Sequence, residues 1–244
     1  DVALVTFEVI QYRSGARTDI KTVTDLARSY GAYVVWDASH ATGAIEMNFD
    51  DNGVDLAVGC TYKYGNSGPG SPAWLYVSKR VQNELQVPIQ GWFGNEDQFG
   101  MGPDYVKASG IRGFQIASPS IVGIRGVQVA FSMIEEAGIS AIAEKAATGT
   151  QMMIDLYDAW LADLGYTLLT SRDPNERGGH ISIGHPQAAQ ICVALRKFVN
   201  VIPDYRTPNA IRLAIAPLPT SYVEIWDGFE RLRELTLSKK YEEI

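Results

Sequence analysis

The first forty residues hold a strand, helix and strand pattern, and this pattern restricts the fold more than any other feature. Residues 2–9 form an apolar run that predicts a strand. Residues 18–19 then offer an N-cap for a helix with apolar residues at helical spacing, and Gly31 is placed to end it. Residues 33–36 predict a second strand, which runs into Asp37. Such a unit predicts an α/β fold with a parallel sheet, in which ligands bind at the carboxyl ends of the strands.

The remaining sequence predicts two parts of different character. Residues 55–59 and 73–77 predict two more strands, whereas residues 90–113 are too rich in glycine and polar residues for regular elements. Two long helices are expected over residues 120–138 and 139–164. Shorter elements should follow, with strands at 166–170, 180–183 and 211–215 and helices at 187–198 and 222–237. This alternation predicts a smaller second domain of the α+β class.

Charge and composition exclude several classes of protein. The chain has 21 lysine and arginine residues against 28 aspartate and glutamate residues, a net charge of -7, so no overall field draws it to nucleic acid or to anionic membranes. No apolar run reaches the roughly 20 residues of a membrane-spanning helix, and a soluble, cytoplasmic protein is expected. Cys60 and Cys192 form no CxxC motif or disulfide framework. Neither they nor the histidines have metal-ligand spacing, so no metal is predicted.

Lys63 is the first candidate for chemistry because it follows an apolar strand, stands between two tyrosines and precedes a glycine-rich loop. By position alone it is more often an exposed lysine at a strand end, with its stem along apolar surface. Asp37 ends a neighbouring strand, so the two residues form either a structural ion pair or two halves of a cofactor site. A lysine can hold an aldehyde cofactor as an imine, and a carboxylate can keep a pyridine nitrogen protonated.

Several blocks of sequence around these residues resemble the kynureninase family. They are DASHATG at 37–43, GCTYKY at 59–64, Asn66 with GPG at 68–70, GWFG at 91–94, RGGH at 177–180, HP at 185–186, DYR at 204–206 and IR at 211–212. The blocks match in order and at matching separations over essentially the whole chain, so the resemblance is highly specific.

The resemblance implies a fold that is similar to the pyridoxal-phosphate (PLP)-dependent transferases of fold type I. Residues 1–130 are then expected to be the C-terminal part of the large cofactor-binding domain, and residues 131–244 the small α+β domain. It also implies hydrolysis of L-kynurenine, or of its 3-hydroxy form, to anthranilate or 3-hydroxyanthranilate and L-alanine. This reaction belongs to tryptophan catabolism and NAD biosynthesis, and the enzymes are usually homodimers with shared active sites.

Four matched positions lie around the expected cofactor. Lys63 matches the lysine that holds pyridoxal phosphate as a Schiff base, and Asp37 matches the partner of its ring nitrogen. His40 matches the histidine beside the cofactor and the substrate, and Tyr62 matches a tyrosine that reaches the phosphate and takes part in proton transfer. Taken alone, His40 would more often be a structural histidine, and Tyr62 a core or interface aromatic residue.

Three further matches lie later in the chain. Trp92 and Ser118 match residues that reach the phosphate from the other subunit. Arg212 matches the arginine that binds the substrate carboxylate, and a guanidinium fork suits this task because it pairs with a carboxylate through two parallel hydrogen bonds. Taken alone, Trp92 would be a core or interface residue, and Arg212 an ordinary arginine at a strand edge.

Two departures separate the chain from the family pattern. Glu8 stands where family members carry serine or threonine, on a strand residue expected to face the cofactor. A carboxylate there would repel the phenolate oxygen of the cofactor or indicate a different substrate, and a shift of one residue would turn it to the opposite face. Family members also begin far upstream of Asp1, and that portion carries the main phosphate-binding loop. An incomplete chain, or a second polypeptide that completes the site, is therefore expected.

Two other interpretations stay open. One is another reaction on the same scaffold, such as transamination or cysteine desulfuration. Desulfuration needs a mobile nucleophilic cysteine, whereas Cys60 follows a predicted buried strand and Cys192 lies in a predicted helix. The other is a non-catalytic chain that keeps the fold and the subunit interface but binds no cofactor, which Glu8 and the upstream portion both favour.

Overall fold

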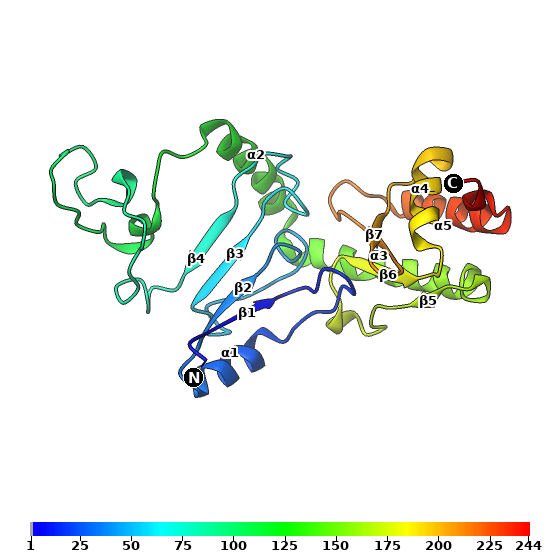
Figure 1. Ribbon diagram of the computed structural model, residues 1–244, viewed down its shortest axis with the longest axis horizontal. Coiled ribbons are helices and arrows are strands. Elements are labelled where there is room, and N and C mark those ends of the chain that lie inside the picture. The colour runs from blue at the N-terminus through cyan, green and yellow to red at the C-terminus, as the bar shows by residue number, and fades with distance from the viewer. Residues whose placement is uncertain (1) are drawn as a thin grey trace.

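Two four-stranded sheets, each with its own core, form the structure (Figure 1). The computed structural model describes residues 2–244. The first sheet has the strand order β1-β2-β3-β4, in which β1 to β3 are parallel and β4 is antiparallel to β3. Its elements are β1 (Leu4–Glu8), α1 (Ile20–Ser29), β2 (Tyr33–Asp37), β3 (Leu56–Gly59) and β4 (Trp74–Val77). The prediction of an α/β fold with a parallel-rich sheet is confirmed.

The first helix begins and ends close to where its sequence predicts. The Asp19 carboxylate accepts a hydrogen bond from the Thr22 N–H, which satisfies one of the free donors of the first turn. Gly31 follows the last turn with a φ of 75°, a left-handed conformation that glycine adopts without strain. The helix turns Thr24 towards the sheet, where its hydroxyl accepts a hydrogen bond of 3.0 Å from the fully buried indole of Trp36. This buried contact ties α1 to β2.

Residues 85–118 project from the β4 side of the first sheet, away from the second unit (Figure 1). The sequence predicts an irregular stretch here, and the structure adds two short 3-10 helices, η1 (Trp92–Gly94) and η2 (Gly110–Phe114). The Lys107 amine ties the segment back to the first unit by donating a hydrogen bond of 2.6 Å to the Gln82 carbonyl. The projection is therefore anchored at its base.

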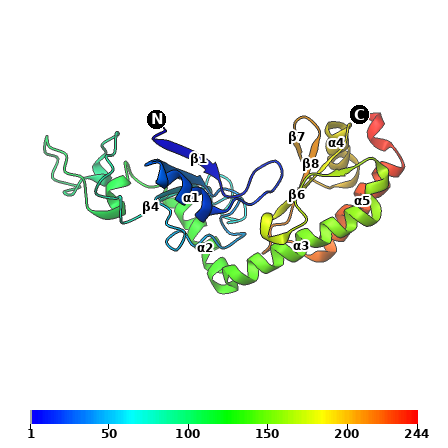
Figure 2. The same cartoon turned by 90° about the horizontal axis from the view of Figure 1, so that it is seen from below.

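Two long helices connect the units (Figure 2). The first, α2 (Ile121–Ala137), packs closely on the first unit, because a Cβ added to Gly126 would lie 3.0 Å from a carbonyl oxygen there. Gly138, with a φ of 79°, separates it from α3 (Ile139–Trp160), which enters the second core. The expected domain boundary between residues 130 and 131 falls within α2 and stays a prediction.

The second unit is an antiparallel sheet of order β5-β6-β8-β7 with helices packed against it. Its elements are β5 (Thr167–Leu168), β6 (His180–Gly184), α4 (Ala188–Val199), β7 (Asp204–Arg206), β8 (Ala210–Ala214) and α5 (Tyr222–Leu237), with short 3-10 helices η3 (Ala162–Leu164), η4 (Pro174–Glu176) and η5 (Lys240–Glu243). The prediction of an α+β unit is confirmed, but β7 is absent from the predicted elements because three residues are too few to reveal a period. Among residues 2–244, no helix combines the length and the apolar character needed to cross a membrane.

The strands of the second sheet alternate between an apolar and a polar face. Ile181 and Ile211 are fully buried in the second core. His180, Ser182 and Arg212 alternate with them along β6 and β8 and therefore point to the opposite face. This polar face of the second sheet meets the first unit.

The loop of residues 10–17, which follows β1, joins the two units. Its Arg13 carbonyl accepts a hydrogen bond of 2.5 Å from the Ser182 hydroxyl, and its Gly15 carbonyl accepts one of 2.9 Å from the Gly178 N–H. Backbone carbonyls have little freedom to move, so these bonds fix the second sheet relative to the loop.

We predict that Gly15→Ala destabilises the protein much more than Gly31→Ala. Both glycines have a positive φ, of 76° and 75°, which costs alanine about 1 to 2 kcal/mol. A Cβ on Gly15 would also lie 2.6 Å from the His180 carbonyl oxygen, whereas a Cβ on Gly31 would meet no atom within 4 Å. Urea unfolding of both variants measures the difference, and equal losses would contradict a tight junction at Gly15.

Candidate active site

Two carboxylates end neighbouring strands of the first sheet. Glu8 ends β1 and Asp37 ends β2, and the two residues are direct partners in the parallel ladder. Direct partners in a parallel pair turn their side chains to the same face, so both carboxylates lie together at the edge where the strands end. Asp37 also accepts a hydrogen bond of 2.8 Å from the Ser39 N–H, which fixes one of its oxygens.

Lys63 lies in the tight turn that follows β3. Asn66 adopts a left-handed conformation with a φ of 56°, and its N–H donates to the Lys63 carbonyl. Gly65 is required in this turn because an added Cβ would lie 2.4 Å from the Thr61 carbonyl oxygen. The Lys63 side chain is partly buried, and its amine lies 5.9 Å from the centre of the Tyr62 ring. Within residues 2–244 the amine makes no hydrogen bond or ion pair with another group.

His40 connects the two units at this edge. Its Nε2 lies 3.3 Å from Nη1 of Arg212, which comes from β8 of the second unit. Arginine has only donors, so Arg212 donates and His40 accepts. Burial first, and then the charges of Lys63 and Arg212, lower the pKa of His40 from 6.5 to about 4. His40 is therefore a neutral ring between two cations.

A second histidine and a buried tyrosine support His40. His180 is fully buried, and its ring centre lies 5.6 Å from that of His40. Its Nδ1 is 3.3 Å from the hydroxyl of Tyr64, the residue after Lys63. Burial lowers the pKa of His180 from 6.5 to about 3 and raises the pKa of Tyr64, so both groups are neutral. These rings therefore fill the junction without adding positive charge to it.

Arg212 is the cation that the second unit brings to the junction. Its side chain is only 13% exposed, and it donates a hydrogen bond of 2.7 Å to the Tyr12 carbonyl and another to the Asp204 carboxylate. Burial lowers the pKa of Arg212, and Asp204 opposes this shift. Arginine stays protonated in proteins even so, which makes Arg212 a fixed positive charge.

The sequence matches kynureninases along its length. Residues 142–232 match the model of the kynureninase C-terminal domain. The chain is 37% identical over 246 residues to the kynureninase of Geobacillus thermodenitrificans (strain NG80-2), and the alignment covers 100% of this chain and 57% of that relative. It is 33% identical over 235 residues to the kynureninase of Pseudomonas fluorescens, and that alignment covers 96% of this chain and 56% of the relative. The resemblance to the kynureninase family is confirmed.

Solved structures with little sequence identity share the fold. An apo cysteine desulfurase from Thermococcus onnurineus NA1 has a TM-score of 0.79 at 18% identity, covering 96% of this chain and 60% of that chain. A mutant of C-DES, with glycine covalently linked to its PLP cofactor, has a TM-score of 0.81 at 15% identity, covering 95% of this chain and 60% of that chain. These likenesses establish the fold alone. The prediction of a partial fold of the type I PLP-dependent transferase class is confirmed, and the chain spans little more than half of the curated kynureninases that it matches.

Five of the residues that the kynureninase resemblance singles out lie at the junction. Asp37, Lys63 and Arg212 are all close enough to His40 for their charges to act on its pKa, and Arg212 also contacts its ring. Tyr62 is adjacent to Lys63, and its side chain is 52% exposed. The structure therefore brings together residues from both units, while the role of each one stays a prediction.

Trp92 and Ser118 lie on the projecting segment instead. Trp92 is 42% exposed in η1, where its ring packs edge-to-face on Phe93, and Ser118 is exposed. In the described part of the chain, no hydrogen bond or ring contact joins either residue to Lys63. An exposed position on a projection is compatible with the kynureninase pattern, in which these residues reach another subunit, and that role stays a prediction.

Several residues of the junction have no role predicted from the sequence. Tyr64 and His180 belong to matched blocks, but only the structure reveals that they contact each other. Asp204 lies on the unpredicted strand β7 and bonds Arg212. The alternation of residues 180–184 was the available signal, because it marks His180 as pointing away from the apolar face.

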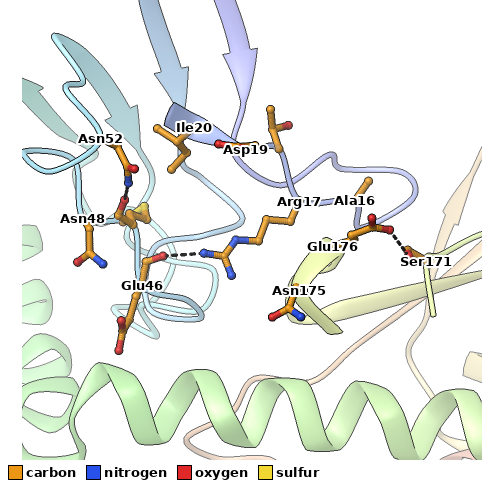
Figure 3. Close-up of a pocket in the computed structure, with 12 residues that line it drawn as sticks. Ala16, Arg17, Asp19, Ile20, Glu46, Asn48, Asn52, Ser171, Asn175 and Glu176 are labelled. Atoms are coloured by element: carbon orange, nitrogen blue, oxygen red, sulfur yellow. Dashed lines mark hydrogen bonds between the residues drawn. The ribbon is translucent and has the colours of Figure 1, made fainter. Parts of the chain in front are cut away.

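A cavity of about 640 Å³ lies between the units near the start of α1, apart from this junction (Figure 3). Arg17 points into it and donates a hydrogen bond of 3.3 Å to the Glu46 carbonyl, and the Glu176 carboxylate accepts one of 2.7 Å from Ser171. Lys63 is not among the described residues that line it. Because polar groups of the lining bond one another, we interpret this cavity as a crevice between the units.

The junction offers a defined set of chemical groups. A free primary amine, two carboxylates, a neutral imidazole and a fixed guanidinium can bind a carbonyl compound through the amine and an anion through the guanidinium. Residues 2–244 contain no group of three or more histidine, cysteine, aspartate or glutamate side chains that could hold a metal ion.

We predict that His40 and His180 stay neutral at about pH 5, where a free histidine is mostly protonated. The chain has only three histidines, so carbon NMR of the rings can follow each of them through a pH titration. In the unfolded chain His40 and His180 bind protons near pH 6.5, whereas in the folded chain they stay unprotonated. The free energy of unfolding should therefore fall as the pH decreases from 6.5 towards 4. A His180 resonance that titrates near 6.5 would contradict its burial.

Proposed function

We propose that this chain is the C-terminal part of a PLP-dependent kynureninase, which hydrolyses L-kynurenine or its 3-hydroxy form to anthranilate or 3-hydroxyanthranilate and L-alanine. The proposal is carried by the meeting of Lys63 and Asp37 from the first unit with Arg212 from the second, around the neutral ring of His40. The chain spans little more than half of each kynureninase that it matches, so the activity belongs to the proposal.

The residues of the junction fit pyridoxal phosphate. Lys63 supplies an amine with no other partner among residues 2–244, and Asp37 supplies a carboxylate held by the Ser39 N–H at the strand ends. When bound, pyridoxal phosphate supplies an aldehyde for an amine and an aromatic ring that withdraws electrons from the substrate. The Lys63 amine suits the aldehyde, and the Asp37 carboxylate suits the protonated ring nitrogen.

Each residue then has a task in the proposed reaction, and Lys63 has two. Lys63 holds the cofactor and afterwards moves the proton at the α-carbon of the substrate. Asp37 keeps the ring nitrogen protonated, and Tyr62 moves a proton near the side-chain carbonyl at which water attacks. Arg212 binds the α-carboxylate of the substrate. His40, neutral and bonded to Arg212, forms the wall beside the cofactor and the substrate without competing for the carboxylate.

The proposal extends to the whole assembly. We take residues 1–130 as part of the large domain and residues 131–244 as the small domain, in a cytoplasmic homodimer whose partner receives Trp92 and Ser118 at its phosphate site. The exposure of both residues on the projecting segment supports this arrangement. The portion of the kynureninases that this chain does not span, or a second polypeptide like it, would complete each site.

Two alternatives differ in their support. Cysteine desulfuration is disfavoured because neither cysteine is a mobile nucleophile. Cys192 is buried, which raises the pKa of its thiol to about 12. The Cys60 Sγ lies 3.6 Å from the Ser39 carbonyl oxygen, to which it donates. A non-catalytic chain is favoured by one observation, the position of Glu8 directly beside Asp37 in the ladder. Cofactor binding separates this second alternative from the main proposal.

We expect borohydride to trap added pyridoxal phosphate on Lys63, because a borohydride-reduced imine becomes a stable amine. The measurement is an absorption spectrum before and after reduction, followed by mass spectrometry of the peptides. Lys63→Ala should lose the adduct, whereas Lys79→Ala, at an exposed lysine just beyond β4, should keep it.

The outcomes of this experiment divide the alternatives. An adduct on Lys63 makes L-kynurenine the first substrate to assay, with anthranilate fluorescence as the signal. Adducts only on exposed lysines, unchanged by Lys63→Ala, would contradict the proposed site and favour a non-catalytic chain.

A further inference from the structure

Asp204 lies between two arginines on the polar face of the second sheet. Its Oδ2 accepts a hydrogen bond of 2.6 Å from Nη2 of Arg206 and another from Nη2 of Arg212. Asp204 and Arg212 are direct partners in the antiparallel ladder of β7 and β8, and Arg206 lies two residues along β7 on the same face. One carboxylate oxygen therefore holds two guanidinium groups that would otherwise repel each other.

These bonds use three of the five N–H donors of Arg212. Its Nη1 donates to the Tyr12 carbonyl and to His40, and its Nη2 donates to Asp204. Its Nε makes no hydrogen bond within residues 2–244, and it is not fully buried. The guanidinium is thus held on two nitrogens and has no partner on the third among residues 2–244.

Arg206 keeps one of its donors without a partner in the described part of the chain. Its Nε is buried and has no hydrogen-bond partner within residues 2–244, and its guanidinium carbon lies 5.5 Å from the centre of the Tyr12 ring. A buried donor without a partner costs free energy, and the charge-assisted hydrogen bond from Arg206 to Asp204 offsets that cost.

The charges of the cluster do not cancel. Arg206 and Arg212 carry two positive charges and Asp204 carries one negative charge, while His40 is neutral. One positive charge is left over, which is what a single carboxylate of a ligand would balance.

We propose that Asp204 and Arg206 are positioning residues for Arg212. Asp204 orients the guanidinium with its Nε open, and Arg206 holds Asp204 and cancels its charge, so that Arg212 keeps its full attraction for a carboxylate. The inference rests on the proposed function for the identity of that carboxylate, but its test needs neither pyridoxal phosphate nor turnover.

The test is a titration of the full chain with propionate, a carboxylate that has no amine to react with a cofactor. Proton–nitrogen correlation spectra follow the Nε–H signal of Arg212, with sodium chloride at equal ionic strength as the reference. We expect a saturable shift of this signal in the unmodified chain. Arg172→Gln, which removes an exposed arginine paired with Asp158, is the matched control and should leave the affinity unchanged.

Three variants separate position from charge. Arg206→Gln lets Asp204 neutralise Arg212 and should weaken propionate binding roughly tenfold, the effect of losing one charge-assisted interaction. Asp204→Asn should also weaken binding, although it makes the cluster more positive. The double variant restores the net charge of the original cluster and should still bind weakly. The ring signal of His180, on the same sheet, reports whether each variant is folded.

The results lead to distinct conclusions. Tighter binding by Asp204→Asn, or full affinity in the double variant, would mean that charge alone governs the subsite and would overturn the inference. Normal affinity in every variant would overturn it as well and leave the proposed function intact. No saturable shift in the unmodified chain would overturn both the inference and the carboxylate-binding role of Arg212.

Discussion

The hydrogen bonds of the loop at residues 10–17 hold the two sheets together, and the candidate site depends on them. Ser182 and Gly178 of the second unit donate to carbonyls of this loop, and Arg212 donates to a third. Backbone carbonyls form the acceptors, so the second sheet is held by groups that cannot swing away as long side chains can. His40 therefore meets Arg212 at 3.3 Å without any covalent connection nearby.

Strand alternation allows the second sheet to serve a core and a site at the same time. Ile181 and Ile211 are buried among the helices, and each is followed by a polar residue on the other face. The apolar face fixes the register of β6 and β8, because a slip of one residue would bury Arg212 in the core. The ladder then sets Asp204 directly opposite Arg212. The position of the guanidinium is thus determined by burial of isoleucines that never touch it.

Local sequence predicts much of the fold because its signals are local. The period of residues 20–29, the cap at Asp19 and the break at Gly138 each depend on a few neighbouring residues. The site is different, since His40 and Arg212 are 172 residues apart and their contact depends on the packing of both units. Resemblance to a family could mark each residue, but it could not reveal that β7 exists or that Asp204 binds Arg212.

The charges of the two units give the candidate site a polarity. The first unit brings the carboxylates of Glu8 and Asp37 side by side at the strand ends, where they outnumber the amine of Lys63, and the second unit brings the excess positive charge of the arginine pair around Asp204. His40 lies at the junction between Lys63 and Arg212, and because burial keeps it neutral it adds no charge to either side. An amino acid carries an ammonium group and a carboxylate on one carbon, and it matches this polarity in one orientation only. In the proposed function, this orientation would place the amine of the substrate towards the strand ends, where Lys63 lies, and its carboxylate towards Arg212.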